Sequence, residues 1–306
     1  MNATAPPPGT TVDIPGAWTH RRIAANSAQF HVAELGAGPL VLLLHGFPEF
    51  WWAWRNQMPV LAAAGWRVAA MDLRGYGGSD KTPRGYDPFT FAADITGVIR
   101  SLGERQAVLV GHGWGGYGAW TAAALRPAHV RAVAVASMPH PLALRRALIR
   151  GRFRHSGSLL GVQLPITPER KLVADDAAHV EHLLRQWSGP HSTFPDDEAA
   201  RRYRAAMRLW PAPHCSLEYQ RWVVRSLFRS DGRRFAQRLR DPIELPALLL
   251  HGTADRTMSP ALATASREFV TGPLQSVELG GIGHFPHEEA PEQVNDALVG
   301  WLAGLD

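Results

Sequence analysis

The stretch Gly111-His112-Gly113-Trp114-Gly115-Gly116 decides the fold of this chain. The apolar run 107–110 before it has the length of a strand, and the alanine-rich run 114–125 after it ends before Pro127, as a helix would. A strand, a sharp turn framed by glycines and a helix are typical of a nucleophile elbow, G-x-X-x-G, which presents the side chain at X on the edge of a sheet. Position X is Gly113, which has no side chain.

Strand-length apolar runs that end in turn residues recur along the chain, with helical stretches between them. Strand and helix alternate, and continuously apolar strands are typical of a parallel sheet covered on both faces. The alternation stops near Pro139 and resumes near Leu245. We therefore predict a doubly wound, mostly parallel α/β core with a helical insertion. Strands are expected at 40–44, 66–71, 107–110, 130–136, 245–250 and 274–279, and helices at 88–102 (capped by Asp87), 114–125, 176–187, 198–210 and 291–302.

The predicted organisation is a disordered lead-in at 1–17, a core at 18–139 and 242–306, and a helical cap at 140–241. A length of 306 residues suits one large α/β unit with an insertion. The start has neither the basic nor the apolar part of a secretory signal, and no run is long and apolar enough to predict a membrane span. The single cysteine, Cys215, excludes an intramolecular disulfide and fits a cytoplasmic protein.

The net charge of +5 is unevenly distributed. Residues 141–241 contain 19 basic and 10 acidic side chains, a local charge of +9. Such a segment could attract anions or a membrane surface, but solvated helix faces are the simpler interpretation. The charges are not interleaved with aromatic residues as on a nucleic-acid-binding surface, so we expect no nucleic-acid partner. The sequence leaves open whether the protein is a monomer or a homodimer.

Two titratable residues complete a catalytic pattern with the elbow. Asp255 lies just past one predicted strand and His284 follows the last one. The chain order elbow, acid, histidine is that of α/β-hydrolases, in which the acid orients an imidazole that takes a proton from the nucleophile or from water. The backbone N–H groups of Phe47 and Trp114 are expected to form an oxyanion hole.

These residues resemble the epoxide-hydrolase branch of the α/β-hydrolase fold. The resemblance covers nearly the whole chain after about residue 18, the cap included. It is specific for the fold and less so for the reaction, since haloalkane dehalogenases and other hydrolases share much of it. The motifs that carry it are HGFPEFWWAWR at 45–55, DLRGYGGSD at 72–80, GHGWGG at 111–116, SMPHP at 137–141, HGTAD at 251–255 and GHFPHEEAPE at 283–292.

In the family that this chain resembles, an elbow aspartate attacks the epoxide, water activated by His and Asp hydrolyses the ester, and two cap tyrosines bind the epoxide oxygen. This sequence departs at all three places. Gly113 replaces the nucleophile, Ser158 the first tyrosine and Gln220, with Tyr219 beside it, the second. A covalent intermediate at position 113 is therefore excluded. The resemblance implies no metal or cofactor, and a mostly apolar substrate pocket at His45, Pro48, Trp51, Ser158, Tyr219 and Gln220. For His45, a structural loop histidine is the simpler interpretation.

Three functions fit these residues. The first is hydrolysis of an epoxide, an ester or a related apolar substrate by water that His284 and Asp255 activate directly. The second is a lyase or isomerase reaction with His284 as the base, and the third is binding of a small apolar molecule without catalysis. His284 and Asp255 are alternatively a structural pair that holds two loops together. Ser137 is an alternative nucleophile, although a turn residue is its simpler interpretation.

Overall fold

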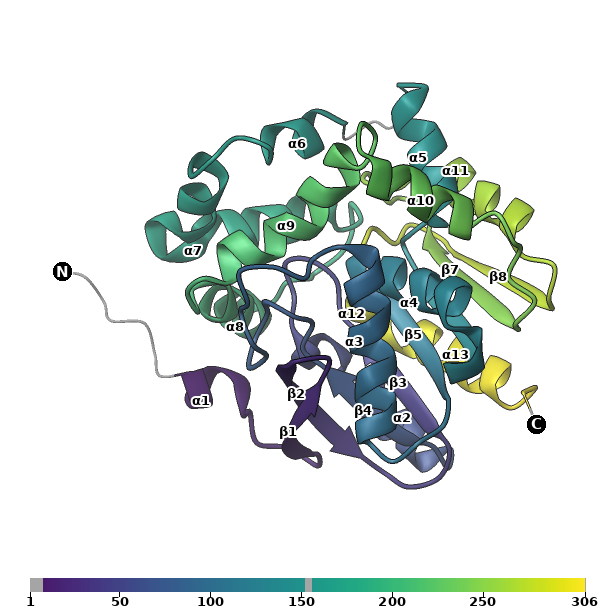
Figure 1. The fold of residues 1–306 in the computed structure, drawn as a ribbon. Coiled ribbons are helices and arrows are strands. Elements are labelled where there is room, and N and C mark those ends of the chain that lie inside the picture. Colours follow the sequence, from purple (N-terminus) through teal and green to yellow (C-terminus); the bar gives the residue numbers. More distant parts are fainter. Residues whose placement is uncertain (1–7, 152–155, 306) are drawn as a thin grey trace.

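The computed structural model describes residues 8–151 and 156–305, and the strands in these ranges form one sheet of eight (Figure 1). Its order is β1-β2-β4-β3-β5-β6-β7-β8. The hairpin β1–β2 and the pair β2–β4 are antiparallel, and all other neighbours are parallel. The strands are β1 Thr19–Ala25, β2 Ala28–Leu35, β3 Leu40–Leu44, β4 Arg67–Met71, β5 Ala107–His112, β6 Val130–Ala136, β7 Ala247–Gly252 and β8 Leu274–Leu279.

The six predicted strands are present, each within two residues of its predicted bounds. Every residue of β3, β5 and β7 is buried, as expected for the centre of a sheet covered on both faces. The hairpin β1–β2 was not predicted. In β1 only Ile23 and Ala25 are buried, because it is an edge strand, and such a strand has no apolar run to reveal it.

The helices of the core cover both faces of the sheet. The chain passes from β3 to β4 through α2 in one direction and from β4 to β6 through α3 and α4 in the other. Because parallel crossovers are right-handed, α2 lies on one face and α3 and α4 on the opposite face, and α13 packs against α2. The core helices are η1 Trp51–Trp54, α2 Met58–Ala63, α3 Pro88–Ser101, α4 Trp114–Leu125, η2 Pro127–His129, α11 Pro260–Thr264, η3 Ala265–Phe269, α12 Pro286–Glu289 and α13 Pro291–Leu302.

The predicted cap of α3 is confirmed. The Asp87 carboxylate accepts hydrogen bonds from the N–H groups of Phe89 and Thr90, and Pro88 occupies the first turn. No helix among the described residues is both long enough and apolar enough to cross a membrane.

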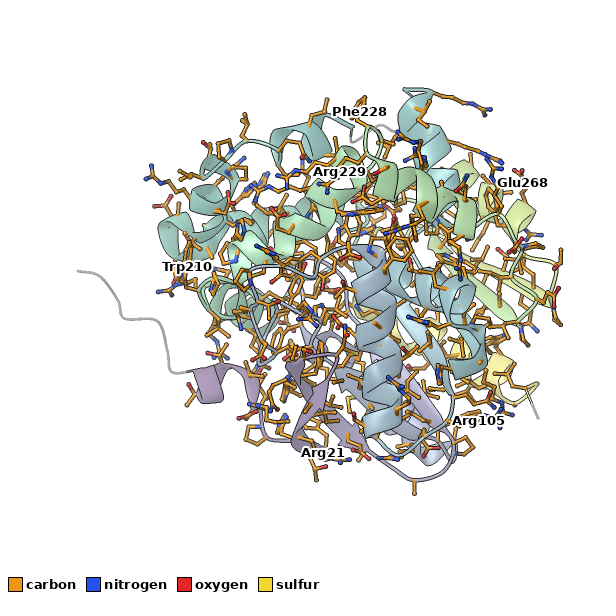
Figure 2. The ribbon with its side chains drawn as sticks, in the orientation of Figure 1. Arg21, Arg105, Trp210, Phe228, Arg229 and Glu268 are labelled. Atoms are coloured by element: carbon orange, nitrogen blue, oxygen red, sulfur yellow. The ribbon has the colours of Figure 1, made fainter. Side chains whose placement is uncertain are left out.

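The regular elements that the structure describes between β6 and β7 are all helices, and these lie above the sheet in Figure 1. The expected cap boundaries at 140 and 241 fall just outside the first and last of these helices. Figure 2 places Trp210 and Phe228 at the cap surface, where they are 72% and 83% exposed. The helices are α5 Pro141–Ile149, α6 Ser156–Gly161, α7 Thr167–Trp187 (interrupted at 174–177), α8 Asp197–Met207, α9 Ala212–Arg225 and α10 Ser230–Arg238.

The predicted disorder of residues 1–17 is wrong for the part that the structure describes. Helix α1 spans Pro8–Val12, and the side chains of Val12 and Ile14 are buried in the core. The Val12 carbonyl accepts a hydrogen bond from Nε1 of Trp51 at 2.9 Å. No apolar pattern predicts this anchoring, because only two apolar residues of a polar segment provide it.

If residues 8–17 are part of the fold, Ile14→Ala lowers the free energy of unfolding by about 2 kcal/mol, the lower end of the range for a buried isoleucine. Urea unfolding measures this change. Val60→Ala is the control, since Val60 is 38% exposed and its truncation is expected to change stability by at most about 0.5 kcal/mol. Equal stabilities of the two variants would mean that this segment contributes nothing.

Candidate functional site

The elbow is an abrupt change of chain direction between β5 and α4. Gly113 has φ 50° and ψ −121°, a conformation that side-chain-bearing residues rarely adopt. Its N–H donates to the Ala136 carbonyl and its own carbonyl accepts from Tyr117, both at 3.0 Å. A Cβ on Gly115 would lie 2.1 Å from the carbonyl oxygen of Leu44, so the close approach of α4 to β3 requires glycine there.

The direction in which a side chain at position 113 would point is well defined. A Cβ built on Gly113 lies 3.5 Å from the Cα of Gly46 and 3.7 Å from Nε2 of His284. Both distances are ordinary van der Waals contacts. The elbow thus has room for a side chain that would face the imidazole.

His284 and Asp255 form a buried pair, as the sequence pattern suggested. Nδ1 of His284 donates to Oδ2 of Asp255 at 2.9 Å. Thr257, which sequence analysis missed, connects the two groups, because its hydroxyl donates to Asp255 at 2.8 Å and lies 2.7 Å from the same Nδ1. The N–H groups of Thr257 and Met258 also donate to the Asp255 carboxylate. The imidazole is held through Nδ1, and Nε2 has no hydrogen-bond partner among the described residues.

The Asp255 carboxylate is ionised in this environment. Burial by itself would raise its pKa, but the charge of His284 and the hydrogen bonds from His284, Met258 and Thr257 lower the pKa of Asp255 to about 2. A negative charge at Nδ1 favours the tautomer in which Nε2 carries the lone pair. The arrangement therefore suits a base whose free nitrogen faces position 113.

A cavity of about 60 Å³ lies in front of Nε2, between the ends of the strands and the cap. Its polar side chains are those of Gln220, Thr257 and His284, and its other walls are mostly apolar. Five of the residues predicted from the sequence, Phe47, Gly113, Trp114, Gln220 and His284, come together here. The full lining is Phe47, Gly113, Trp114, Met138, Leu159, Trp187, Gln220, Thr257, Met258 and His284.

Four residues predicted for the pocket do not line this cavity. His45 is fully buried, where its Nε2 accepts from the Leu73 N–H, so it is a structural histidine. Trp51 is fully buried as well, against Trp18 in the N-terminal segment. Pro48 is buried in the same loop as His45.

The hydroxyl of Tyr219, the fourth of these residues, donates to the carbonyl of Arg74 at 3.0 Å. Because this hydroxyl already donates to a backbone carbonyl of the core, Tyr219 does not take the place of a cap tyrosine that donates to a ligand. Ser158 lies in α6, but its side chain is outside the described part of the structure. The alternative nucleophile Ser137 is 1% exposed and is not part of the cavity wall.

A second buried network, also missed in the sequence, holds the backbone behind His284. The Glu49 carboxylate accepts from Nδ1 of His112 at 2.8 Å and from Nε2 of His287 at 3.0 Å. Nε2 of His112 donates to the carbonyl of His284 at 2.7 Å. Burial would lower the pKa of His112, but the charge of Glu49 and the hydrogen bond to it raise the pKa above its usual value.

Two clusters of described residues contain side chains that can ligate metals. They are Glu49, His112 and His287, and Asp13, His20 and His31. In the first, the carboxylate bonds directly to both imidazoles, and in the second, Nδ1 of His20 and Nε2 of His31 are 2.9 Å apart. We interpret both as hydrogen-bonded clusters, because their ligand atoms contact one another instead of surrounding a common centre at the 2.0–2.2 Å distances that zinc requires.

Comparison with known proteins identifies the family. Residues 39–291 match the model of the alpha/beta hydrolase fold family. The chain belongs to the α/β-hydrolase family. Its relatives place it in the epoxide-hydrolase-like branch: it is 32% identical to "Epoxide hydrolase A" of Mycobacterium tuberculosis, with 95% of this chain and 99% of that protein covered. It is also 32% identical to an "Epoxide hydrolase" of Caballeronia sordidicola, with 97% of each covered.

Solved structures agree with this assignment. A crystal structure of Epoxide Hydrolase A from Mycobacterium thermoresistibile is 28% identical, with a TM-score of 0.78 over 94% of this chain and 99% of that one. An epoxide hydrolase from an endophytic Streptomyces is 29% identical, with a TM-score of 0.82 over 95% of this chain and 97% of that one. The predicted α/β-hydrolase fold is therefore confirmed, and the chain is an epoxide-hydrolase-like α/β-hydrolase.

The pKa of Asp255 predicts a pH-dependent contribution to stability. Because the pKa of about 2 lies below the ordinary value of 3.8, the ionised carboxylate stabilises the fold by about 2 kcal/mol at neutral pH. This contribution is lost as the pH falls from about 4 towards 2. Asp255→Asn is therefore less stable than the unaltered protein at neutral pH, and the difference shrinks in urea unfolding at about pH 3. A difference that stays constant over this range would show that Asp255 titrates normally.

The backbone at position 113 predicts a cost for any side chain there. Gly113→Ala and Gly113→Asp are each expected to lower the free energy of unfolding by about 1–3 kcal/mol, because a residue with a side chain is strained at φ 50°. The added Cβ meets no close contact, so this backbone strain is the cost that the experiment measures. Gly300→Ala is the matched control. Its Cβ meets nothing within 4 Å and lies in α13, where alanine is favoured by up to about 1 kcal/mol. Thermal unfolding of all three variants measures these changes, and an undiminished stability of Gly113→Ala would argue against strain at the elbow.

Proposed function

We propose that this protein hydrolyses an apolar epoxide or ester with water that His284 activates directly, without a covalent intermediate. The observation that carries the proposal is Nε2 of His284, which has no partner within 8–151 and 156–305 and lies 3.7 Å from the position of a Cβ on Gly113. The Asp255 carboxylate orients the ring from the other side at 2.9 Å. A base held in this way, with room for a water molecule in front of it, has what general-base hydrolysis requires.

In this mechanism His284 takes one proton and gives it back, so the pair of His284 and Asp255 ends in its starting state. Nε2 of His284 takes a proton from water while the water oxygen forms a bond to the electrophilic carbon of the substrate. Asp255 stabilises the resulting imidazolium through Nδ1–H. The C–O bond of the epoxide or ester breaks, and the departing oxygen receives the proton back from Nε2.

Two kinds of donor are proposed to stabilise the oxygen on which negative charge develops. The first is the pair of N–H groups of Phe47 and Trp114, which line the same cavity wall as Gly113. The second is the amide of Gln220, which supplies N–H donors at the place where the family resemblance implies a tyrosine. Gln220 is 7% exposed and makes no hydrogen bond to another described side chain. Its amide is therefore available to a ligand.

The shape of the site favours a substrate with an apolar tail. A chamber of about 260 Å³ in the cap shares Phe47, Trp187 and Gln220 with the smaller cavity at His284. Its remaining wall includes apolar side chains such as Leu172 and Leu217. We propose that the reacting group enters the small cavity and that the tail occupies this chamber.

Binding without turnover is the second candidate function, and the geometry of position 113 favours it. Glycine relieves the strain of φ 50°, so a chain no longer selected for covalent chemistry gains stability by acquiring glycine here. A lyase or isomerase reaction would use His284 as its base as well. It differs from hydrolysis because no solvent oxygen enters the product.

The proposal is tested by turnover of a panel of aryl and alkyl epoxides and short esters in ¹⁸O-labelled water. We expect one labelled oxygen per product molecule, and His284→Gln is expected to reduce turnover by about 10²–10⁴-fold. His191→Gln, which alters an exposed histidine, is the control and retains full activity. Equal turnover by both variants would overturn the role of His284, and an unlabelled product would indicate isomerisation or elimination. Saturable binding with no turnover would favour the second candidate function.

A further inference from the structure

We propose that the hollow beside Gly113 is a binding site for a small free carboxylate such as formate or acetate. The ligand would occupy the place of an elbow side chain. This site and its ligand class are independent of whether the protein turns over a substrate. The catalytic consequence, described below, rests on the proposed hydrolysis.

The first support is the space and the group that faces it. Apart from its chain neighbours, the described atoms within 4 Å of a Cβ on Gly113 would be the Cα of Gly46 at 3.5 Å and Nε2 of His284 at 3.7 Å. His284 is 6% exposed, and its Nε2 has no hydrogen-bond partner among the described residues although Nδ1 has two. A buried polar nitrogen without a partner, aimed into a cavity, favours a ligand that forms a hydrogen bond with it. Because Nε2 of the neutral ring carries the lone pair, the ligand enters as the carboxylic acid and passes its proton to Nε2, which leaves a carboxylate beside Nε2–H.

The second support is the electrostatics of the helix that begins at the same point. Helix α4 has 12 residues, and Gly113 at its start provides no capping side chain. The N–H groups of the first turn and the helix dipole favour an anion at this end. Among the described residues, no Asp or Glu side chain lines the cavity, because Asp255 lies behind the imidazole. The described part of the wall therefore holds no negative charge that would repel an added carboxylate.

The third support is the match in size and polarity. The cavity of about 60 Å³ exceeds the space for one water molecule but is small for an extended ligand. Phe47, Met138 and Trp187 form an apolar wall that suits the methyl group of acetate. One carboxylate oxygen would accept from Nε2–H of His284 and the other from an N–H at the start of α4.

A bound carboxylate would give the protein an exchangeable nucleophile. Its oxygen forms a bond to an epoxide carbon, the ring C–O bond breaks, and the ring oxygen takes the proton from Nε2 of His284. The neutral imidazole then removes a proton from water, and the hydroxide attacks the ester carbonyl. The acyl C–O bond to the diol then breaks, and the departing oxygen takes the remaining proton of that water. The diol therefore carries an oxygen that came from the carboxylate, and the released carboxylate retains an oxygen from water.

Binding is measured first, by titration of ¹³C-labelled acetate with the unaltered protein and NMR detection of the bound ligand. We expect Gly113→Ala, whose methyl group enters the hollow, to weaken binding at least about tenfold, and Gly300→Ala to leave it unchanged. On the unaltered protein, a branched carboxylate such as pivalate is expected to bind at least about tenfold more weakly than acetate. This size series needs no variant to fold. Equal binding of acetate and pivalate, or no binding of acetate, would overturn the site.

Turnover then separates this inference from the proposed function. With ¹⁸O-labelled acetate in unlabelled water, we expect label in the diol and an epoxide turnover at least about tenfold faster than with chloride at equal ionic strength. Turnover that acetate neither accelerates nor labels would overturn the exchangeable nucleophile and leave direct hydrolysis standing. Acetate binding without turnover of any epoxide or ester would support the site and refute the proposed hydrolysis.

Discussion

The geometry of the site depends on one buried carboxylate, that of Glu49. It accepts hydrogen bonds from Gly46 in its own loop, from His112 at the end of β5 and from His287 near the C-terminus. Burying an ionised carboxylate away from water costs several kcal/mol of folding free energy unless hydrogen-bond donors fill its acceptor sites. The loop of Glu49, the end of β5 and the segment near the C-terminus must therefore lie together. His112 extends this constraint to the His284 carbonyl, which fixes the backbone of the histidine from behind.

A second buried carboxylate, that of Asp255, also positions His284. Asp255 holds the ring of His284 through Nδ1, whereas Glu49 holds its backbone through His112. The imidazole is therefore fixed at two points that share no hydrogen bond. In the described part of the chain nothing bonds to Nε2, which lies in a cavity with mostly apolar walls, where a polar group interacts more strongly with a ligand than it would in water. Rigid placement of one free nitrogen is the property that the proposed hydrolysis and the carboxylate site have in common.

Sequence patterns predicted the features that are local or continuous. The six apolar strands, the Asp87 cap and the turn at Gly113 each depend on a few neighbouring residues, and the motif order identified His284 and Asp255. Sequence patterns did not predict side-chain positions that depend on hydrogen bonds between segments far apart in the chain. Tyr219 donates to Arg74, 145 positions away, and therefore does not face the pocket. Glu49 accepts from His112 and His287, 63 and 238 positions away, and Thr257 contacts His284, 27 positions away, so no spacing rule connects these pairs. The edge strand β1 has too few buried residues to form an apolar run.

The elbow turn itself does not depend on a side chain at position 113. Gly115 must approach Leu44 so closely that a Cβ would lie 2.1 Å from its carbonyl oxygen, and Gly111 would likewise meet Gly115 at 2.4 Å. These two contacts fix the passage from β5 to α4 by packing alone. A side chain at position 113 would therefore add backbone strain at φ 50° and is not needed to hold the turn. The imidazole of His284, the carboxylate of Asp255 and the start of α4 are thus arranged around a glycine whose backbone does not need a side chain to hold the turn.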